Sequence, residues 1–196
     1  MGSEPIDIIR GDHRVIDRLL ERVIAAVASA RSGGAVDPRA FRKVAEFLRL
    51  YVEGAHFARE QAMLLAMRGA GMPEDTGLLA QLFDEHAHGR EQTTELCALA
   101  KQLERGGGEE GLREALLDGM DAYARMHRAH CAVEERHLLP LAQRLLKNVQ
   151  QDALRSQFAR VEARFGSLAD AAAAVERAMD GTPKAARPRR AATAKR

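Results

Sequence analysis

Two histidine–glutamate pairs of identical spacing are the residues of this sequence best suited to chemistry. His56 and Glu60 are four residues apart, and so are His130 and Glu134; two leucines follow each pair at the same distance. Residues four apart lie on one face of an α-helix, about 6 Å apart along its axis. Each pair can therefore present an imidazole and a carboxylate to one point, and both groups are donors for first-row metals.

A further histidine precedes each pair, which makes the pattern an internal repeat. His13 lies 43 residues before His56, and His86 lies 44 residues before His130. These polar residues fall in stripes of helical spacing, where bundle helices normally bury aliphatic side chains. Because an unpaired buried charge is costly, they need hydrogen bonds, neutralisation or a shared metal. We predict six metal ligands: His13, His56, Glu60, His86, His130 and Glu134.

The composition favours a helical protein of a reducing compartment. Aromatic residues make up only 4%, whereas alanine, leucine, glutamate and arginine are plentiful, which favours an all-α fold. The two cysteines, Cys97 and Cys131, form neither a metal-ligand spacing nor a disulfide framework. No run of about 18 apolar residues and no signal-peptide pattern is present. We therefore expect a cytoplasmic protein without a membrane partner.

Hydrophobic residues recur at helical spacing in five segments. The predicted helices span about 4–31, 38–69, 75–105, 110–147 and 150–179. Short, glycine-rich connections join the first four, which favours an antiparallel up-down four-helix bundle over residues 1–147. The fifth helix, within residues 148–181, carries no histidine. We expect it to pack across the bundle or to form a homodimer contact.

The end of the chain differs in charge from the rest. Residues 182–196 hold six basic residues and no acidic one, so the remainder carries a net charge of −4 although the whole chain carries +2. With two prolines and almost no bulky apolar residue, this basic tail is predicted to be disordered. A solubilising role is favoured over nucleic-acid binding, because aromatic interleaving and recognisable binding motifs are absent.

The predicted ligand set defines its metals only broadly. If both glutamates bridge two metals, each metal receives two histidines and two carboxylate oxygens, and one coordination position stays open. Nitrogen and oxygen donors without a thiolate suit iron or manganese, and zinc would also bind.

Four further residues on the helix that carries His130 are candidates for the site, but each also has a purely structural explanation. His127 and His137 fall on its stripe and are expected to be polar core residues or hydrogen-bond partners of the ligands. Tyr123 shares that face, and we expect it to pack in the core rather than to contact an oxidant. Cys131 should point about 100° away from His130, which predicts a buried structural cysteine.

Three other positions near the predicted ligands complete the candidate site. Gly89, one turn after His86, predicts open core volume that a small ligand could occupy. Glu53 and Glu135 lie close to ligand turns, where each could hydrogen-bond a ligand, but Glu135 is expected to face outward.

The order of the six predicted ligands resembles the haemerythrin-like (HHE cation-binding) domain of bacterial type, over roughly the first three quarters of the chain. That resemblance implies a non-haem di-iron centre in a four-helix bundle that handles dioxygen, nitric oxide or related molecules. Oxygen-carrying haemerythrins have a second histidine four residues after the third-helix ligand, whereas this chain has Arg90, which disfavours simple oxygen storage. Neighbouring residues also look like family positions: Asp12, Glu85, Gly71-Met72-Pro73, Glu135 and Leu138-Leu139-Pro140.

Three functions are compatible with such a centre. The first is a binding module that senses or scavenges dioxygen or nitric oxide. The second is an enzyme that reduces nitric oxide or decomposes peroxide at the same metals. The third is a structural bundle in which the metal only stabilises the fold.

Overall fold

Every element of the protein is a helix in the part of the chain that the computed structural model describes, residues 4–106 and 110–181. The predicted all-α class is therefore confirmed. The basic tail, residues 182–196, lies outside the described residues, so its predicted disorder remains a prediction.

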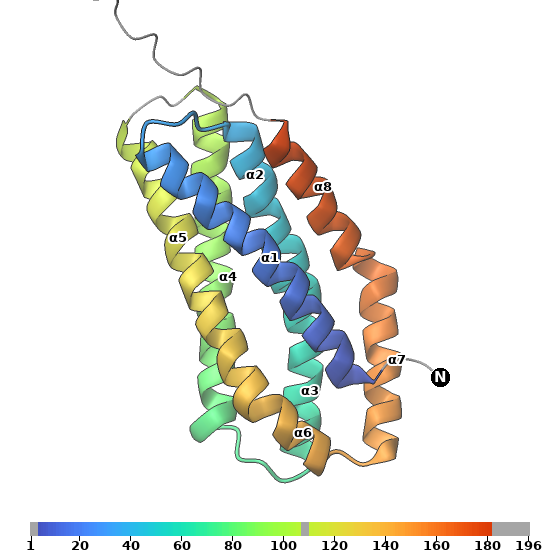
Figure 1. Cartoon of the computed structure of the whole chain (residues 1–196). Coiled ribbons are helices and arrows are strands. Elements are labelled where there is room, and N and C mark those ends of the chain that lie inside the picture. The colour runs from blue at the N-terminus through green and yellow to red at the C-terminus, as the bar shows by residue number, and fades with distance from the viewer. Residues whose placement is uncertain (1–3, 107–109, 182–196) are drawn as a thin grey trace, which may run out of the picture.

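Four helical rods lie side by side in the bundle, and successive rods run in opposite directions (Figure 1). The first rod is α1 (Pro5–Arg31) and the third is α4 (Gly77–Glu104). The second and fourth rods each contain a π-helical stretch. The second consists of α2 (Pro38–Phe47), η1 (Leu48–His56) and α3 (Phe57–Gly69), and the fourth of α5 (Glu110–Val133), η2 (Glu134–Leu138) and α6 (Leu139–Leu145).

The C-terminal region forms two helices, so the prediction of one continuous helix over 150–179 is wrong. Helix α7 (Asn148–Phe165) packs against α3 and η1, and α8 (Leu168–Asp180) packs against α1 and α2 (Figure 1). Between them Gly166 adopts a φ of 79°, which side chains disfavour. Ser167 then caps α8, because its hydroxyl accepts a hydrogen bond from the backbone N–H of Asp170.

The π-helical stretches change which residues face the core. A π-helical turn holds about one residue more than an α-helical turn, so it rotates the following side chains around the axis. Within η2, Leu138 is fully buried and His137 is exposed, and Leu139, the first residue of α6, is also fully buried. The expected core position of His137 is therefore wrong, because straight α-helical spacing does not hold beyond Glu134.

The core consists of two apolar clusters with a polar layer between them. Along α1, His13 lies between Ile9 of one cluster and Ile16 of the other. The α8-side cluster includes Ile16, Leu20, Leu48, Leu116, Met120 and Leu168. The α7-side cluster includes Ile9, Met63, Leu82, Leu138, Leu139 and Phe158. This arrangement places the polar layer away from both ends of the bundle.

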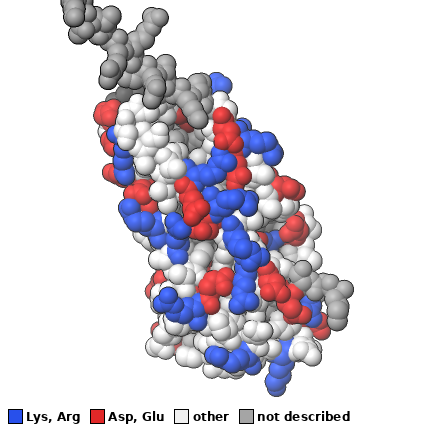
Figure 2. Space-filling view, in the orientation of Figure 1, with Lys and Arg blue, Asp and Glu red and all other residues white. Residues whose placement is uncertain are grey.

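The surface carries charges of both signs. On the face shown in Figure 2, basic and acidic side chains are interspersed and do not form a patch of one sign. Among the described helices, none is both long and apolar enough to span a lipid bilayer.

Candidate metal centre

All six predicted ligands lie together in the polar layer. They are buried, with exposed fractions from 0% for His56, Glu60 and Glu134 to 6% for His13. Their donor atoms form two groups, each within 4.8 Å: one contains His13 and His56, the other contains His86 and His130, and both contain Glu60 and Glu134. We call these groups the His13–His56 half-site and the His86–His130 half-site.

Each glutamate presents one oxygen to each half-site. In Glu60, Oε1 lies 2.7 Å from Nε2 of His56 and 3.2 Å from Nε2 of His13, whereas Oε2 lies 3.1 Å from Nε2 of His86. In Glu134, Oε2 lies 3.1 Å from Nε2 of His13, and Oε1 lies 3.7 Å from Nε2 of His130. This is the arrangement in which a carboxylate bridges two cations.

Many of these donor atoms are buried without a hydrogen bond. Although Nε2 of His56 is only 2.7 Å from Glu60, the two atoms do not meet at a hydrogen-bonding angle. Buried polar atoms without partners are rare, because leaving one unsatisfied costs about 1–3 kcal/mol. Among the described residues, the unpartnered atoms include Nε2 of His56, His86 and His130, Oε2 of Glu60 and Oε1 of Glu134. Their convergence fits the metal centre that the sequence predicts.

Carboxylates outside the cluster hold three of the four imidazoles. Nδ1 of His130 is 2.7 Å from Glu85, Nδ1 of His13 is 2.9 Å from Glu135, and Nδ1 of His56 is 3.4 Å from Asp12. Such a contact keeps a proton on Nδ1, so that Nε2 is the nitrogen that would give up its proton and offer a lone pair to a bound metal. Glu135 therefore does not simply face outward as expected, because α1 brings His13 against it.

A buried arginine that the sequence analysis missed ties α7 to the centre. Arg59 is only 2% exposed, and its guanidinium forms ion pairs of 2.6 Å with Asp12 and with Glu162 of α7. Since Asp12 contacts His56, the chain of contacts runs from α7 to a predicted ligand. The helical stripe gave no signal for Arg59, which lies beside Glu60 and off the predicted face.

Phe57 is a second contact that the sequence analysis missed. Its ring stacks on the imidazole of His86, with the centroids 3.9 Å apart and an angle of 18° between the planes. Phe57 follows the π-helical stretch and is 2% exposed. The stacking restrains His86, whose Nδ1 has no partner among the described residues.

Gly89 does not leave open volume, so that prediction is wrong. A Cβ atom at this position would lie 2.8 Å from Oε1 of Glu53, which means that the Glu53 carboxylate fills the space. Tyr123 donates a hydrogen bond of 2.7 Å to the same oxygen, and both residues are buried. Burial raises the pKa of Glu53 to about 7.

The prediction that Cys131 is a buried structural cysteine is wrong, because the residue is only partly buried and its thiol lies beside the centre. Its Sγ lies within 4.8 Å of donor atoms of His13 and His56, and 3.4 Å from Nε2 of His127. Cys131 and Glu135 are one turn apart on the flank of α5 and η2 that faces α1. Because His13 extends from α1 onto this flank, the thiol reaches the centre even though it points away from His130.

Burial and mutual contacts shift the pKa values of the cluster. Burial raises the pKa of Glu134 to about 8, and the nearby charge of Glu60 adds to the shift. Burial lowers the pKa of His130, but contacts with Glu60 and Glu85 outweigh it and raise the pKa to about 10. Burial raises the pKa of Glu60, but the charge of His56 and contacts with other histidines hold it well below its usual value. A bound cation would displace the protons that Glu134 and His130 retain.

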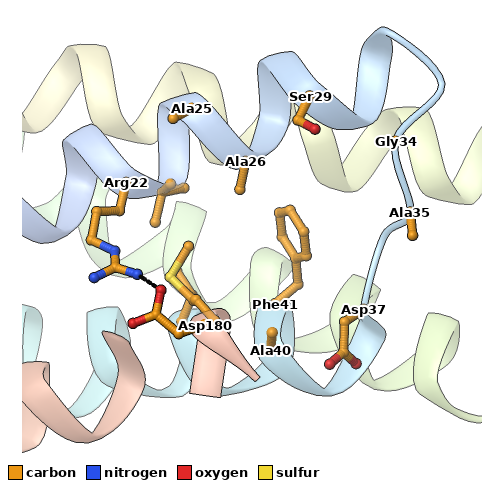
Figure 3. A pocket seen from close by; sticks show the side chains of 13 residues that line it. Arg22, Ala25, Ala26, Ser29, Gly34, Ala35, Asp37, Ala40, Phe41 and Asp180 are labelled. Carbon is orange, nitrogen blue, oxygen red and sulfur yellow. Dashed lines mark hydrogen bonds and ion pairs between the residues drawn. The ribbon is translucent and has the colours of Figure 1, made fainter. Parts of the chain in front are cut away.

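The described part of the bundle has several surface cavities, and one of them adjoins the centre. A cavity of about 360 Å³ between α1 and α5 is lined by residues that include His13, His127 and Cys131. Another of about 580 Å³, between α1, α2 and α8, contains none of the predicted ligands. Figure 3 shows Phe41 inside it and the Arg22–Asp180 ion pair at its side.

The fold and the site together define a cation-binding helical bundle. The model of the Hemerythrin HHE cation binding domain matches residues 4–142. The chain therefore belongs to this family, which confirms the resemblance seen in the sequence. No curated protein and no solved structure matches the chain.

Proposed function

We propose that the six buried residues bind two iron ions. His13 and His56 ligate one ion, His86 and His130 ligate the other, and Glu60 and Glu134 bridge both. The observation that carries this proposal is that each glutamate directs its two oxygens to opposite half-sites. Nitrogen and oxygen donors suit iron, and manganese and zinc are the alternatives that metal analysis of the purified protein distinguishes.

The centre is further proposed to bind a small oxidant, dioxygen or nitric oxide, as a sensor or scavenger in the cytoplasm. Iron held by these six residues would supply the redox chemistry and bind the diatomic molecule. The surrounding residues supply the environment: the two apolar clusters limit water on either side, and the outer carboxylates fix the imidazoles. The cavity beside His13 offers a small molecule a route from the surface.

An optical spectrum of anaerobically iron-loaded, reduced protein tests this function. Oxygen is admitted and then removed, and nitric oxide is added to a parallel sample. A band that appears and reverses supports a sensor or carrier. A ferric band that persists until a reductant is added favours turnover of nitric oxide or peroxide. No spectral change with either gas would contradict the proposal and favour a structural metal.

A further inference from the structure

We propose that two residues of α7, Glu162 and Phe165, are positioning residues of the centre: they hold the chain on both sides of His56 and so set the metal affinity of the His13–His56 half-site. This inference rests on the proposed metal centre. Helix α7 lies beyond residues 4–142, which match the family, so its contacts near the centre are a feature of this chain.

The first contact lies two residues before His56. A Cβ atom at Gly54 would lie only 3.0 Å from Cε1 of Phe165 and 3.4 Å from its Cζ. The ring of Phe165 therefore packs directly on the backbone of Gly54, and a side chain at residue 54 would press against it. Gly54 belongs to η1, the π-helical stretch that ends at His56.

The second contact lies three residues after His56. Arg59 donates hydrogen bonds from Nη2 to Glu162 and from Nη1 to Asp12, each 2.6 Å long. The Asp12 oxygen that accepts from Arg59 also lies 3.4 Å from Nδ1 of His56. Glu162 thus fixes the buried guanidinium from the side of α7, and the guanidinium fixes Asp12 against the imidazole.

The π-helical form of η1 makes the position of His56 sensitive to these contacts. Turns of π-helix are rare and occur mostly within α-helices at functional sites, so the packing around η1 must hold it in this form. Phe165 restrains the turn that carries His56. Glu60 depends less on α7, because it also contacts His86 of the other half-site. The effect of α7 therefore falls mainly on the His13–His56 half-site.

Chelator competition with zinc tests this inference in proteins that keep the histidines of one half-site. His86→Ala keeps both histidines of the His13–His56 half-site, and His13→Ala keeps both of the other. We expect Phe165→Ala to weaken zinc binding about 10-fold in the His86→Ala protein and less than about twofold in the His13→Ala protein. Glu162→Gln should act in the same direction.

Two further variants separate positioning from a general loss of stability. Gly54→Ala introduces a residue that favours helices, yet its Cβ presses on the Phe165 ring, so it should weaken zinc binding in the His86→Ala protein. Adding it to Phe165→Ala should weaken binding no further, because the ring is then absent. Val27→Ala, a buried change roughly 20 Å along α1 from His13, should lower the midpoint of denaturant unfolding and leave zinc binding unchanged.

The possible failures of this inference differ from those of the metal centre. Equal weakening by Phe165→Ala in the two half-site proteins would overturn the role of α7 at His56, as would unchanged zinc affinity in all the α7 and Gly54 variants. Wild-type protein without bound zinc would contradict the metal centre itself. If Phe165→Ala fails to fold, Glu162→Gln and Gly54→Ala make the same test. If one half-site alone binds no zinc, one of the two affinities of the otherwise unchanged protein should fall.

Discussion

The two half-sites have matching ligands but different surroundings. Each supplies two imidazole nitrogens to the shared glutamates. In the His13–His56 half-site both Nδ1 atoms contact carboxylates, and one of these, Asp12, is held by buried Arg59. In the His86–His130 half-site only His130 has such a partner, and His86 is restrained by Phe57 instead.

This difference shows that the internal repeat specifies the ligands and not their supports. A repeated His-x-x-x-Glu spacing places donors on one helical face in both halves. The supports come from different helices: Asp12 of α1, Arg59 of α3 and Glu135 of η2 on one side, and Glu85 of α4 and Phe57 of α3 on the other. The half-sites should therefore respond differently to changes in the supporting residues and similarly to changes in the ligands.

Removing the shared carboxylate should have the largest effect. We expect Glu60→Gln to reduce bound iron from two ions to less than about one per chain, because Glu60 contacts histidines of both half-sites. Metal analysis after anaerobic loading and desalting measures this. The exposed Glu95→Gln on α4 is the control. Two ions retained in Glu60→Gln would refute the bridging role.

Removing one histidine from either half should cost one ion. His13→Ala and His86→Ala should each lower bound iron from two ions to about one, because the other half-site keeps its own donors. His88→Ala, two residues from His86 but exposed, should retain both ions. Loss of both ions in either variant would show that the half-sites do not bind independently.

Arg59, the buried arginine that holds Asp12 beside the His13–His56 half-site, should contribute to stability. Arg59→Met leaves the buried Asp12 carboxylate without its ion pair, so we expect the free energy of unfolding to fall by about 3 kcal/mol. Glu162→Gln removes only the half-exposed partner and should cost less than about 1 kcal/mol. Denaturant titrations of the metal-free proteins measure both. Equal losses of unfolding free energy in the two variants would mean that the buried Asp12–Arg59 ion pair contributes no more than the exposed Glu162–Arg59 pair.

The outer carboxylate of the other half-site should affect metal affinity. Glu85→Ala removes the partner that orients His130, and we expect about 10- to 100-fold weaker binding of one of the two ions. Competition with a chelator measures this affinity. The exposed Glu91→Gln on the same helix should leave it unchanged. Unaltered affinity in Glu85→Ala would remove the proposed orienting role.

The smallest effect is expected at Glu53, a buried carboxylate outside both half-sites. Burial raises its pKa to about 7 in the folded protein, from 4.5. The folded state therefore holds a proton that the unfolded state has lost, and wild-type stability falls as pH rises from about 4.5 to 7.

Glu53→Gln should remove this loss, because the amide does not ionise and Tyr123 can still donate to its oxygen. Relative to wild type, the free energy of unfolding of the metal-free variant should rise by roughly 1–2 kcal/mol across that pH range. Denaturant titrations at several pH values measure the change. A difference independent of pH would mean that Glu53 does not ionise there.

The sequence predicted the helical class and the residues that meet at the centre, because both depend on local helical spacing. Ile9, His13 and Ile16 keep that spacing along α1. Features that depend on packing between rods were missed. Arg59 is fixed by an ion pair with Glu162 of α7, and Cys131 meets the centre through His13 of α1. His137 faces outward because η2 is π-helical.

The most direct test of the central claim is the anomalous scattering of iron in crystals of the loaded protein. We predict two iron peaks about 3.5–4 Å apart, both beside Glu60 and Glu134. One should adjoin His13 and His56, and the other should adjoin His86 and His130. A single peak, or iron bound away from the two glutamates, would contradict the claim that these six residues form one bridged centre.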